Sequence, residues 1–156
     1  MSILIGKAAP NFNLFNTEKK EIELNGLKGK NIVLLFFPLA FTSTCTKELC
    51  EVRDSIAMYN NLNAVVLGIS VDSLFSLAKF KAEQNLNFDL LSDFNKTAST
   101  DYHSIYAEFI FNMHGVSKRS AFVIDKNGVV KHEEILESAG DIPSFEKIVN
   151  TLKELN

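Results

Sequence analysis

The chain has 156 residues and a formal net charge of -3 at pH 7, with 46% hydrophobic and 22% charged residues. These values are typical of a globular core that needs neither a disulfide nor a structural metal, so we expect residues 1–156 to form a single domain. The sequence has no basic cluster of the kind that binds nucleic acid or an anionic membrane, and no apolar segment long enough to span a bilayer. Because the first residues also lack a signal-peptide pattern, we expect a cytoplasmic protein.

Most of the chain alternates between predicted strands and helices. Two continuous apolar runs, at residues 31–37 and 64–70, have the length and composition of buried central strands. The other predictions in this part are short extended segments at 12–15 and 21–24, helices at 44–60 and 73–85, a short strand at 88–91 and a short helix at 96–102.

The end of the chain predicts a β-hairpin followed by a helix. Apolar runs at residues 121–125 and 129–134 flank Asn127-Gly128, a pair that favours a tight turn because both residues tolerate positive φ. Residues 141–155 predict a final helix with a proline in its first turn.

This order of elements predicts an α/β fold. Strand–helix–strand units require parallel pairing, and the hairpin adds antiparallel strands, so we expect a mixed central sheet flanked by helices. A thioredoxin-like fold has this arrangement. A doubly wound parallel sheet is the alternative, but it explains the hairpin less well.

The two cysteines of the chain, Cys45 and Cys50, lie near the start of the helix predicted at residues 44–60. They can be buried core residues, part of a metal site or a reactive pair. A zinc site usually has about four ligands, with about two residues between paired cysteines. Here four residues separate the pair, and the histidines left to complete a site are His103, His114 and His132. In a reducing compartment, two nearby thiols are more typical of redox chemistry than of a structural disulfide.

Cys45 is expected in the first turn of this helix, where unpaired backbone N–H groups and the helix dipole stabilise a thiolate. Thr42 or Ser43 can act as the N-cap, because either hydroxyl can accept a hydrogen bond from a first-turn N–H group. Glu48 follows one turn later and, taken alone, is most simply interpreted as a solvated carboxylate. The pattern favours one activated thiolate with a second thiol nearby.

An intact helix keeps the two thiols too far apart to form a disulfide. Cys50 lies about 140° around the helix from Cys45, and their Cα atoms are about 8.6 Å apart, whereas a disulfide requires about 4.4–6.8 Å. A bond between them would require the first turns of the helix to unwind. The sequence therefore predicts a redox-dependent change of structure here if the pair reacts.

Pro38, Thr42 and Cys45 match the pattern P-x-x-x-T-x-x-C of the peroxiredoxins, a family that the chain resembles along nearly its whole length. Glu48 stands three residues after the cysteine, as it often does in that family. Arg119, in the segment KRSAFVID, stands where peroxiredoxins carry an arginine that reaches the reactive cysteine. The segments APNFNL and VVLGISVDS also resemble the opening and a strand-to-helix turn of the family.

The resemblance implies a thiol-dependent peroxidase on a thioredoxin-like fold, with no cofactor and no metal. Cys45 would reduce hydrogen peroxide or an organic hydroperoxide and become a sulfenic acid, while Thr42 and Arg119 would bind the peroxide and stabilise charge. Pro38 would shape the loop over the thiol, and Glu48 would orient Arg119. Without the resemblance, Arg119 would be interpreted as a surface charge and Thr42 as a helix cap.

The resemblance leaves open how such an enzyme is recycled. Cys50 matches the resolving cysteine of the bacterioferritin-comigratory (Q-type) subgroup, which implies a Cys45–Cys50 disulfide and a thioredoxin-like reductant. The segment PLAFTSTCTKEL also resembles the one-cysteine E-type subgroup, in which an external low-molecular-weight thiol would act instead. A non-enzymatic redox-sensing module is a further alternative, although it would not require both Thr42 and Arg119. Thr44 stands where the family is often apolar, so substrate preference stays open, as does the choice between a monomer and a homodimer.

Overall fold

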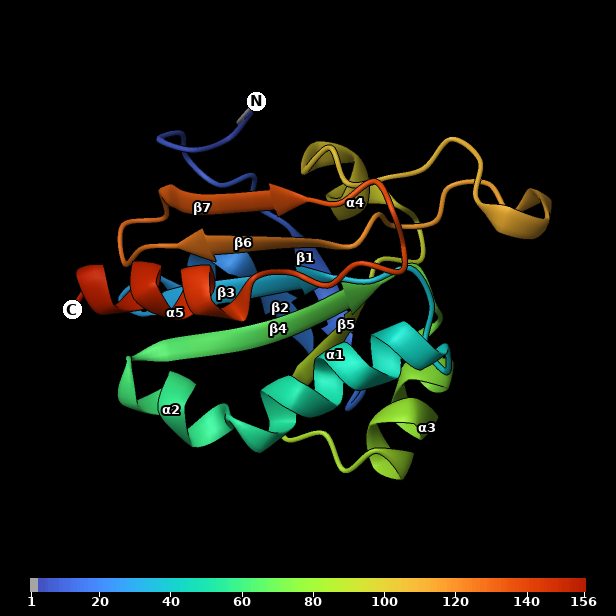
Figure 1. The fold of residues 1–156 in the computed structure, drawn as a ribbon, viewed down its shortest axis with the longest axis horizontal. Coiled ribbons are helices and arrows are strands. Elements are labelled where there is room, and N and C mark those ends of the chain that lie inside the picture. Colours follow the sequence, from blue (N-terminus) through green and yellow to red (C-terminus); the bar gives the residue numbers. More distant parts are fainter. Residues whose placement is uncertain (1–2) are drawn as a thin grey trace.

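The computed structural model describes residues 3–156, which share one seven-stranded mixed sheet with helices on both faces (Figure 1). The strand order across the sheet is β2-β1-β5-β4-β3-β6-β7. None of the helices in residues 3–156 is long and apolar enough to span a bilayer. The strands are β1 (Asn13–Asn16), β2 (Glu21–Glu23), β3 (Asn31–Phe36), β4 (Ala64–Ser70), β5 (Asp89–Ser92), β6 (Ser120–Ile124) and β7 (Val130–Ile135). The helices are α1 (Ser43–Asp54), α2 (Ile56–Asn61), α3 (Leu74–Glu83), α4 (Thr97–Asp101) and α5 (Phe145–Glu154), with short 3-10 helices at Leu24–Leu27 and Ile110–Asn112.

The centre of the sheet is built from the apolar runs that predict buried strands. β3 is buried at every position and pairs in parallel with β4 and antiparallel with β6. A strand covered on both faces presents no side to water, which explains its continuous apolar sequence. The antiparallel pair of β6 and β7 confirms the expected mixed sheet, and the alternative of a doubly wound parallel sheet is wrong.

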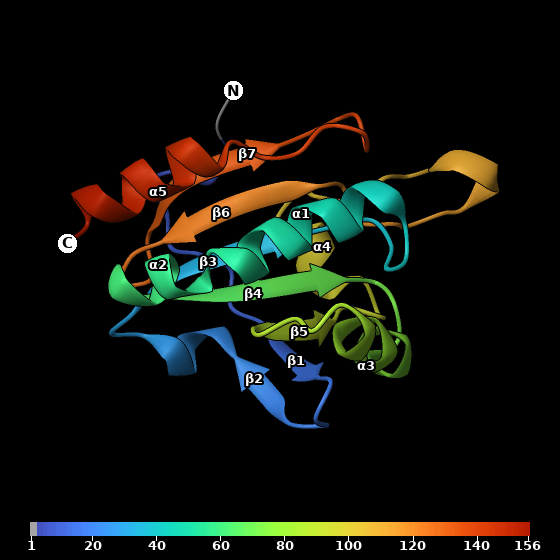
Figure 2. The same cartoon turned by 60° about the horizontal axis from the view of Figure 1, so that its bottom comes forward.

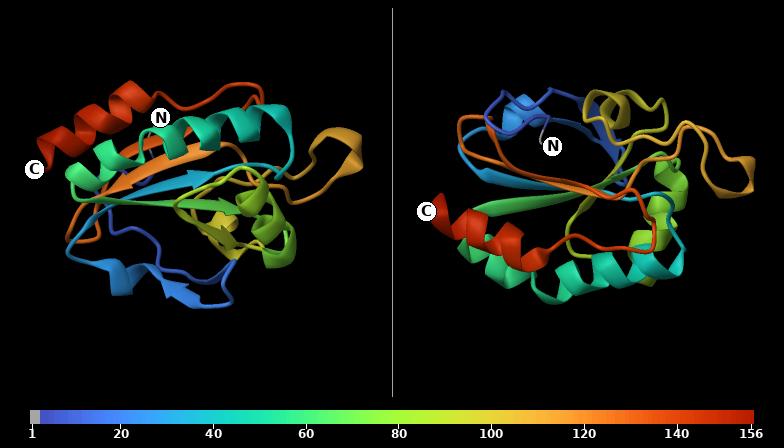
Figure 3. Two further views of the ribbon diagram at one scale, coloured as in Figure 1. Left: turned by 90° about the horizontal axis from the view of Figure 1, so that it is seen from below. Right: turned by 45° about the horizontal axis from the view of Figure 1, so that its top comes forward.

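Two hydrophobic cores lie on opposite faces of the sheet, because successive side chains of a strand point to opposite sides. Val33 and Leu35 belong to the core covered by α1, α2, α3 and α5, and this core also contains Cys45. Leu34 and Phe36 belong to the core on the other face, which is covered by α4 and the N-terminal segment. Figures 2 and 3 show α1, α2 and α5 together over one face. Cys45 therefore lies inside one of the two cores.

The segment predicted as one helix at residues 44–60 is two helices, because the chain bends at Ser55. Ser55 has φ -111° and ψ 10°, and its N–H donates to the carbonyl of Val52, three residues back instead of four. Asp54 and Ser55 are poor residues for a helix interior, since their side chains compete for backbone hydrogen bonds. The bend separates α1, which carries both cysteines, from α2, and the prediction of one continuous helix is wrong.

The predicted hairpin is present between β6 and β7. The N–H of Gly128 donates to the Asp125 carbonyl at 3.0 Å, and the Asp125 carboxylate accepts from the N–H groups of Asn127 and Val129. Of the Asn-Gly pair, Gly128 alone has positive φ, at 84°, so the turn is not the expected type with two positive φ values. The side chain of Asp125 thus stabilises a turn that the sequence pattern locates correctly.

The last helix starts later than its sequence pattern indicates. The Ser144 hydroxyl accepts from the N–H of Lys147 at 3.3 Å and caps α5, so the helix begins at Phe145. Pro143 is buried just before this cap and lies outside the helix that it was expected to open. The capping hydroxyl, rather than the proline, decides where the helix begins.

The loop between α4 and β6 extends away from the body of the molecule (Figure 1). Its two sides meet at isolated bridges, Ile105 with Ser117 and Phe109 with Met113. Phe111 near its tip is 88% exposed and has a positive φ of 56°. We call residues 105–117 the arm.

Gly68 in β4 marks a place where the core leaves no room for a side chain. An added Cβ would lie 2.7 Å from Leu90 Cδ2 and 3.4 Å from Phe37 Cε1. We therefore expect Gly68→Ala to lower the free energy of unfolding by about 1–3 kcal/mol through overpacking, as measured by urea denaturation. Gly26→Ala is the control, because an added Cβ there meets nothing within 4 Å. Equal stability of the two variants would contradict the tight packing at Gly68.

Candidate active site

Cys45 is the third residue of α1 and is completely buried, with 0% of its surface exposed. Thr42 is the N-cap residue of this helix, with an extended backbone at φ -90° and ψ 153°. The first N–H groups of an α-helix have no partner within the helix. The predicted first-turn position of Cys45 is confirmed, and its sulfur lies where these groups favour negative charge.

The hydroxyl of Thr42 does not cap the helix, although the sequence allowed it to. It donates to the carbonyl of Leu39 at 2.9 Å, and no first-turn N–H donates to it. The Thr42 carbonyl instead accepts from the N–H and the hydroxyl of Thr46, at 3.0 and 2.8 Å. Because its one proton is used on Leu39, the Thr42 hydroxyl has lone pairs left to accept a hydrogen bond.

Arg119 brings a permanent positive charge to the sulfur of Cys45. Its Nη2 donates to Cys45 Sγ at 3.1 Å, and its Nη1 donates to Glu48 Oε1 at 2.7 Å. Its Nε and Nη2 also donate to the carbonyl of Ala139, at 3.3 and 3.0 Å. Burial lowers the pKa of Arg119, but Cys45 and Glu48 raise it more, so the net shift is upward. The interpretation of Arg119 as a surface charge is wrong, since the side chain is 1% exposed.

Glu48 lies one turn after Cys45 and is also completely buried, so its interpretation as a solvated carboxylate is wrong. One oxygen, Oε1, accepts from Arg119, while Oε2 has no hydrogen-bond partner among residues 3–156. Burial raises the pKa of Glu48 to about 7, against the lowering effect of Arg119 and with a small increase from Glu51. The carboxyl group therefore changes charge near neutral pH while it contacts Arg119.

Pro38 ends the central strand and begins the loop that leads into α1. The N–H of Phe37 still donates to the carbonyl of Ile69, at 2.9 Å, whereas Pro38 has no N–H with which to continue the ladder. Phe41, further along the loop, has a positive φ of 69°. The chain therefore turns sharply just before Thr42, which places the N-cap residue above the end of the strand.

A cavity of about 320 Å³ opens beside the start of α1. Its wall comes from parts of the chain that lie far apart in the sequence: the loop after β3 with the start of α1, the arm, the residue before β6, and the loop after β7. The lining residues are Pro38, Leu39, Thr42, Ser43, Thr44, Phe109, Ile110, Phe111, Met113, Arg119, Ala139 and Gly140. The contribution of Ala139, whose carbonyl accepts from Arg119, has no signal in the sequence, because any residue type supplies a backbone carbonyl.

Cys50 is half-buried, and its Sγ donates to Gln84 Oε1 at 3.4 Å, just beyond the end of α3. Both cysteines are free thiols, and α1 is continuous from Ser43 to Asp54. The helix therefore separates the thiols as expected.

Within residues 3–156, no three side chains of the metal-binding types histidine, cysteine, aspartate and glutamate gather at one point.

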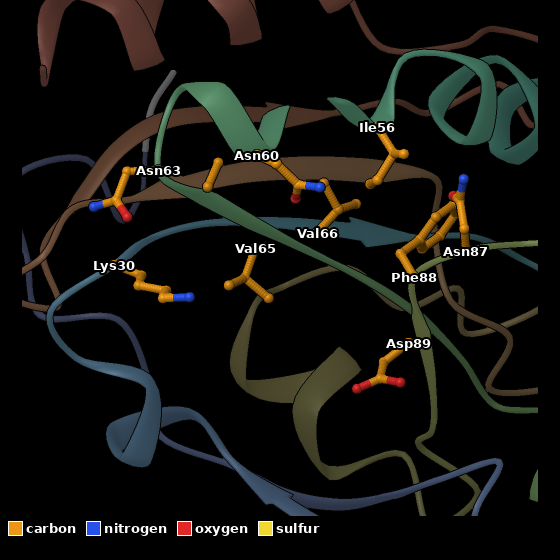
Figure 4. A pocket seen from close by; sticks show the side chains of 10 residues that line it. Lys30, Ile56, Asn60, Asn63, Val65, Val66, Asn87, Phe88 and Asp89 are labelled. Atoms are coloured by element: carbon orange, nitrogen blue, oxygen red, sulfur yellow. The ribbon is translucent and has the colours of Figure 1, made fainter. Parts of the chain in front are cut away.

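A second cavity, of about 390 Å³, lies at the opposite end of the sheet (Figure 4). It lies beside the first residues of β4 and β5, whereas the predicted site lies beyond the last residues of β3 and β4. Its polar lining comes from Lys30, Asn60, Asn63, Asn87 and Asp89. It contains none of the residues predicted for the site, whereas Pro38, Thr42 and Arg119 line the first cavity.

Residues 5–133 match the AhpC/TSA family. The chain belongs to this family of peroxiredoxins. It is 40% identical to peroxiredoxin Bcp of Bacillus subtilis over 130 residues, which cover 82% of each chain. It is 37% identical over 145 residues to the mitochondrial thioredoxin-dependent peroxide reductase of Mus musculus, covering 88% of this chain and 53% of that protein. The crystal structure of peroxidoxin BcpB from Mycobacterium tuberculosis is similar with a TM-score of 0.87 at 28% identity, over 99% of both chains.

As a peroxiredoxin, the protein is a thiol-dependent peroxidase, an oxidoreductase that acts on a peroxide and is reduced by a thiol. This confirms the enzymatic interpretation over the alternative of a non-enzymatic redox-sensing module. The match to solved peroxiredoxins also confirms the thioredoxin-like fold.

Stability is expected to depend on pH through Glu48. Because folding raises the pKa of this carboxyl from 4.5 to about 7, the folded protein holds its proton more tightly than the unfolded chain does. This contribution is fully present below pH 4.5 and is lost as the pH rises through about 7, a change on the order of 3 kcal/mol.

Urea denaturation from below pH 4.5 to pH 8, compared with Glu48→Gln, measures this contribution. The variant lacks the titrating group, so the stability of the native protein relative to the variant should fall across the range. Parallel pH profiles for the two proteins would contradict a titration of Glu48 in this window.

Proposed function

We propose that Cys45 is the peroxidatic thiol that reduces hydrogen peroxide and organic hydroperoxides. The observation that carries the proposal is the contact of 3.1 Å between Arg119 Nη2 and Cys45 Sγ at a sulfur shielded from water. A thiolate, rather than a thiol, is the nucleophile, and a fixed guanidinium beside it stabilises that anion. Glu48, which contacts the same guanidinium, acts as the residue that orients it.

The proposed first step transfers OH from the peroxide to sulfur. The Cys45 thiolate attacks the terminal oxygen of R–O–O–H, an S–O bond forms, and the O–O bond breaks. The leaving RO⁻ takes a proton and departs as an alcohol or as water. Thr42 accepts the O–H of the bound peroxide, while Arg119 and the free N–H groups of the first turn stabilise the charge that develops on oxygen. Pro38 closes the loop over the reacting atoms.

The shape of the cavity supports substrates with an apolar group. Its wall combines Leu39 of the loop after β3 with Phe109, Ile110 and Met113 of the arm. At about 320 Å³ it has space for a small organic group in addition to the peroxide oxygens. Thr44 adds a hydroxyl to this lining, and this hydroxyl can form a hydrogen bond with hydrogen peroxide.

Cys50 is the proposed resolving cysteine. Its thiol would condense with the Cys45 sulfenic acid to give a disulfide and one molecule of water, after the first turns of α1 unwind. A thioredoxin-like donor would then reduce the disulfide, and the name of the mouse relative supports this class of reductant. The alternative is direct reduction of the sulfenic acid by an external low-molecular-weight thiol, which the continuous helix between the two thiols favours.

The domain organisation, the partners and the cellular compartment of the protein are also proposals. A single sheet contains strands from both ends of the chain, which supports a single domain over residues 1–156. The sequence has a net charge of -3 and no basic cluster, which supports a protein without nucleic-acid or membrane partners. We propose that it acts as a monomer or a homodimer. The chemistry uses only thiols, so no cofactor is proposed, and the reductant it requires is present in the cytoplasm.

Loss of the peroxidatic thiol should abolish the fast reaction with peroxide. We expect the reduced protein to consume hydrogen peroxide orders of magnitude faster than free cysteine does, and Cys45→Ser to remove this activity, as followed by stopped-flow detection of thiol loss. Cys50→Ser is the matched control, because it removes a thiol from the same helix and should leave the fast step intact. A fast step that survives in Cys45→Ser would assign the chemistry to another group.

Loss of the resolving thiol should separate the first step from turnover. In Cys50→Ser the sulfenic acid should persist, be trapped by dimedone and be detected by mass spectrometry, while turnover with thioredoxin stops. The native protein treated with peroxide should instead show an internal Cys45–Cys50 bridge. Unchanged thioredoxin-dependent turnover in Cys50→Ser would favour the one-cysteine mechanism.

A further inference from the structure

We propose that Asp72 is a positioning residue that sets the direction of the Thr42 hydroxyl. The inference rests on the proposed role of Thr42 as the acceptor for the O–H of the peroxide. Asp72 lies two residues after β4, at the end of the sheet where α1 begins, and it is not among the residues that line the cavity. It therefore acts through other groups and not on the substrate itself.

One peptide group connects Asp72 to Thr42. The carboxylate oxygen Oδ2 of Asp72 accepts from the N–H of Ala40 at 2.8 Å. The carbonyl of the same peptide bond belongs to Leu39, and it accepts from the Thr42 hydroxyl at 2.9 Å. Because a peptide group is planar, holding its N–H also fixes the direction of its C=O. The carboxylate thus determines where the Thr42 hydroxyl finds its acceptor.

The negative charge of the carboxylate adds to this geometric effect. A charged acceptor polarises the peptide group, and hydrogen bonds connected in a chain strengthen one another. The Leu39 carbonyl becomes a better acceptor, so the one proton of the Thr42 hydroxyl stays committed to it. The lone pairs of that hydroxyl then remain available to the O–H of a hydroperoxide.

Asp72 is itself firmly attached to the sheet. Its carboxylate accepts from the Ser70 hydroxyl at 2.7 Å, and its N–H donates to the same hydroxyl at 3.2 Å. Its carbonyl accepts from the Ser92 hydroxyl at 2.6 Å. Ser70 and Ser92 are the last residues of β4 and β5 and pair with each other in the sheet. The carboxylate therefore has little freedom to follow the loop if the loop moves.

The loop that Asp72 holds needs such an anchor. Phe41 lies between Ala40 and Thr42 with φ 69°, a conformation that is strained for a phenylalanine. Its ring packs against Phe80 of α3, with the ring centroids 5.2 Å apart. A strained turn persists only when its surroundings hold it, and the bond from Ala40 to Asp72 supplies that support beside the ring contact.

The reaction of Asp72→Ala with two reagents tests the proposal. The rate constant with hydrogen peroxide, measured by stopped flow, should fall about tenfold as the hydroxyl loses its fixed direction. Alkylation of Cys45 by iodoacetamide should keep its rate, because it requires no acceptor for an O–H group. Asp72→Asn keeps a neutral acceptor and should react with peroxide at an intermediate rate. Equal losses in both reactions, or no loss in either, would overturn the assignment.

A double-mutant cycle separates this proposal from the role of Thr42. Thr42→Val alone should slow the peroxide reaction, and an unchanged rate would remove the role of Thr42 and the Asp72 proposal together. A slow Thr42→Val beside a normal Asp72→Ala would overturn only the Asp72 proposal. In the double variant, Asp72→Ala should add no further loss, since the hydroxyl that it directs is gone. Losses that multiply would show that the two residues act independently and would overturn the coupling.

Asp125→Ala is the matched control for lost stability. Its carboxylate also accepts from backbone N–H groups, those of Asn127 and Val129, but at the opposite end of the sheet. This variant should unfold at a lower temperature and keep the peroxide rate of the native protein. A peroxide rate as low as that of Asp72→Ala would overturn the proposal, because general destabilisation would then explain both.

Discussion

A buried guanidinium beside a buried sulfur is the contact on which the rest of the site depends. An unpaired charge inside a protein is strongly destabilising, so Arg119 is tolerated because Glu48, Cys45 and the Ala139 carbonyl use its donors. The exclusion of water that makes the charge costly also strengthens its attraction to a negative sulfur. In the proposed mechanism, stability and reactivity are therefore linked, because the guanidinium that would stabilise the Cys45 thiolate is itself held by its contact with that sulfur.

The register of the sheet brings Arg119 to Cys45, although the two are 74 positions apart in the chain. Phe36 at the end of β3 pairs with Ser120 at the start of β6, so the residue before β6 lies beside the loop that leads into α1. The carbonyl of Arg119 accepts a hydrogen bond from the N–H of Leu136 at 2.9 Å, and this bond fixes the backbone of Arg119 from the side of β7. If the strand in the position of β6 ran parallel to β3, its last residue and not its first would lie beside the end of β3. The antiparallel hairpin is thus a requirement of the site.

The sequence predicts the features that depend on local pattern, and it misses those that depend on contacts between distant segments. Apolar runs identify β3 and β4, the Asn-Gly pair identifies the hairpin, and the cap pattern places Cys45 in a first turn. The direction of the Thr42 hydroxyl, the burial of Glu48 and the carbonyl of Ala139 are decided by segments that meet only in the folded chain. The bend at Ser55 is only partly predictable from the sequence. The residues at the bend weaken a helix locally, but the apolar periodicity continues across it.

In the proposed cycle, α1 must meet two conflicting requirements: it is folded to hold one thiol beside a cation, and it opens to bring two thiols together. Its second half is fixed to the segment after α3, since Arg53 Nη1 donates to the Gln84 carbonyl at 2.6 Å and Asn87 Nδ2 donates to the Arg53 carbonyl at 3.2 Å. Its first turn has no side-chain cap, and local opening starts where few contacts hold the backbone. In the proposed cycle, Cys50 would therefore stay with the anchored half and Cys45 would be the thiol that moves. Oxidation would itself permit this movement, because a guanidinium holds a neutral sulfenic acid less strongly than it holds a thiolate.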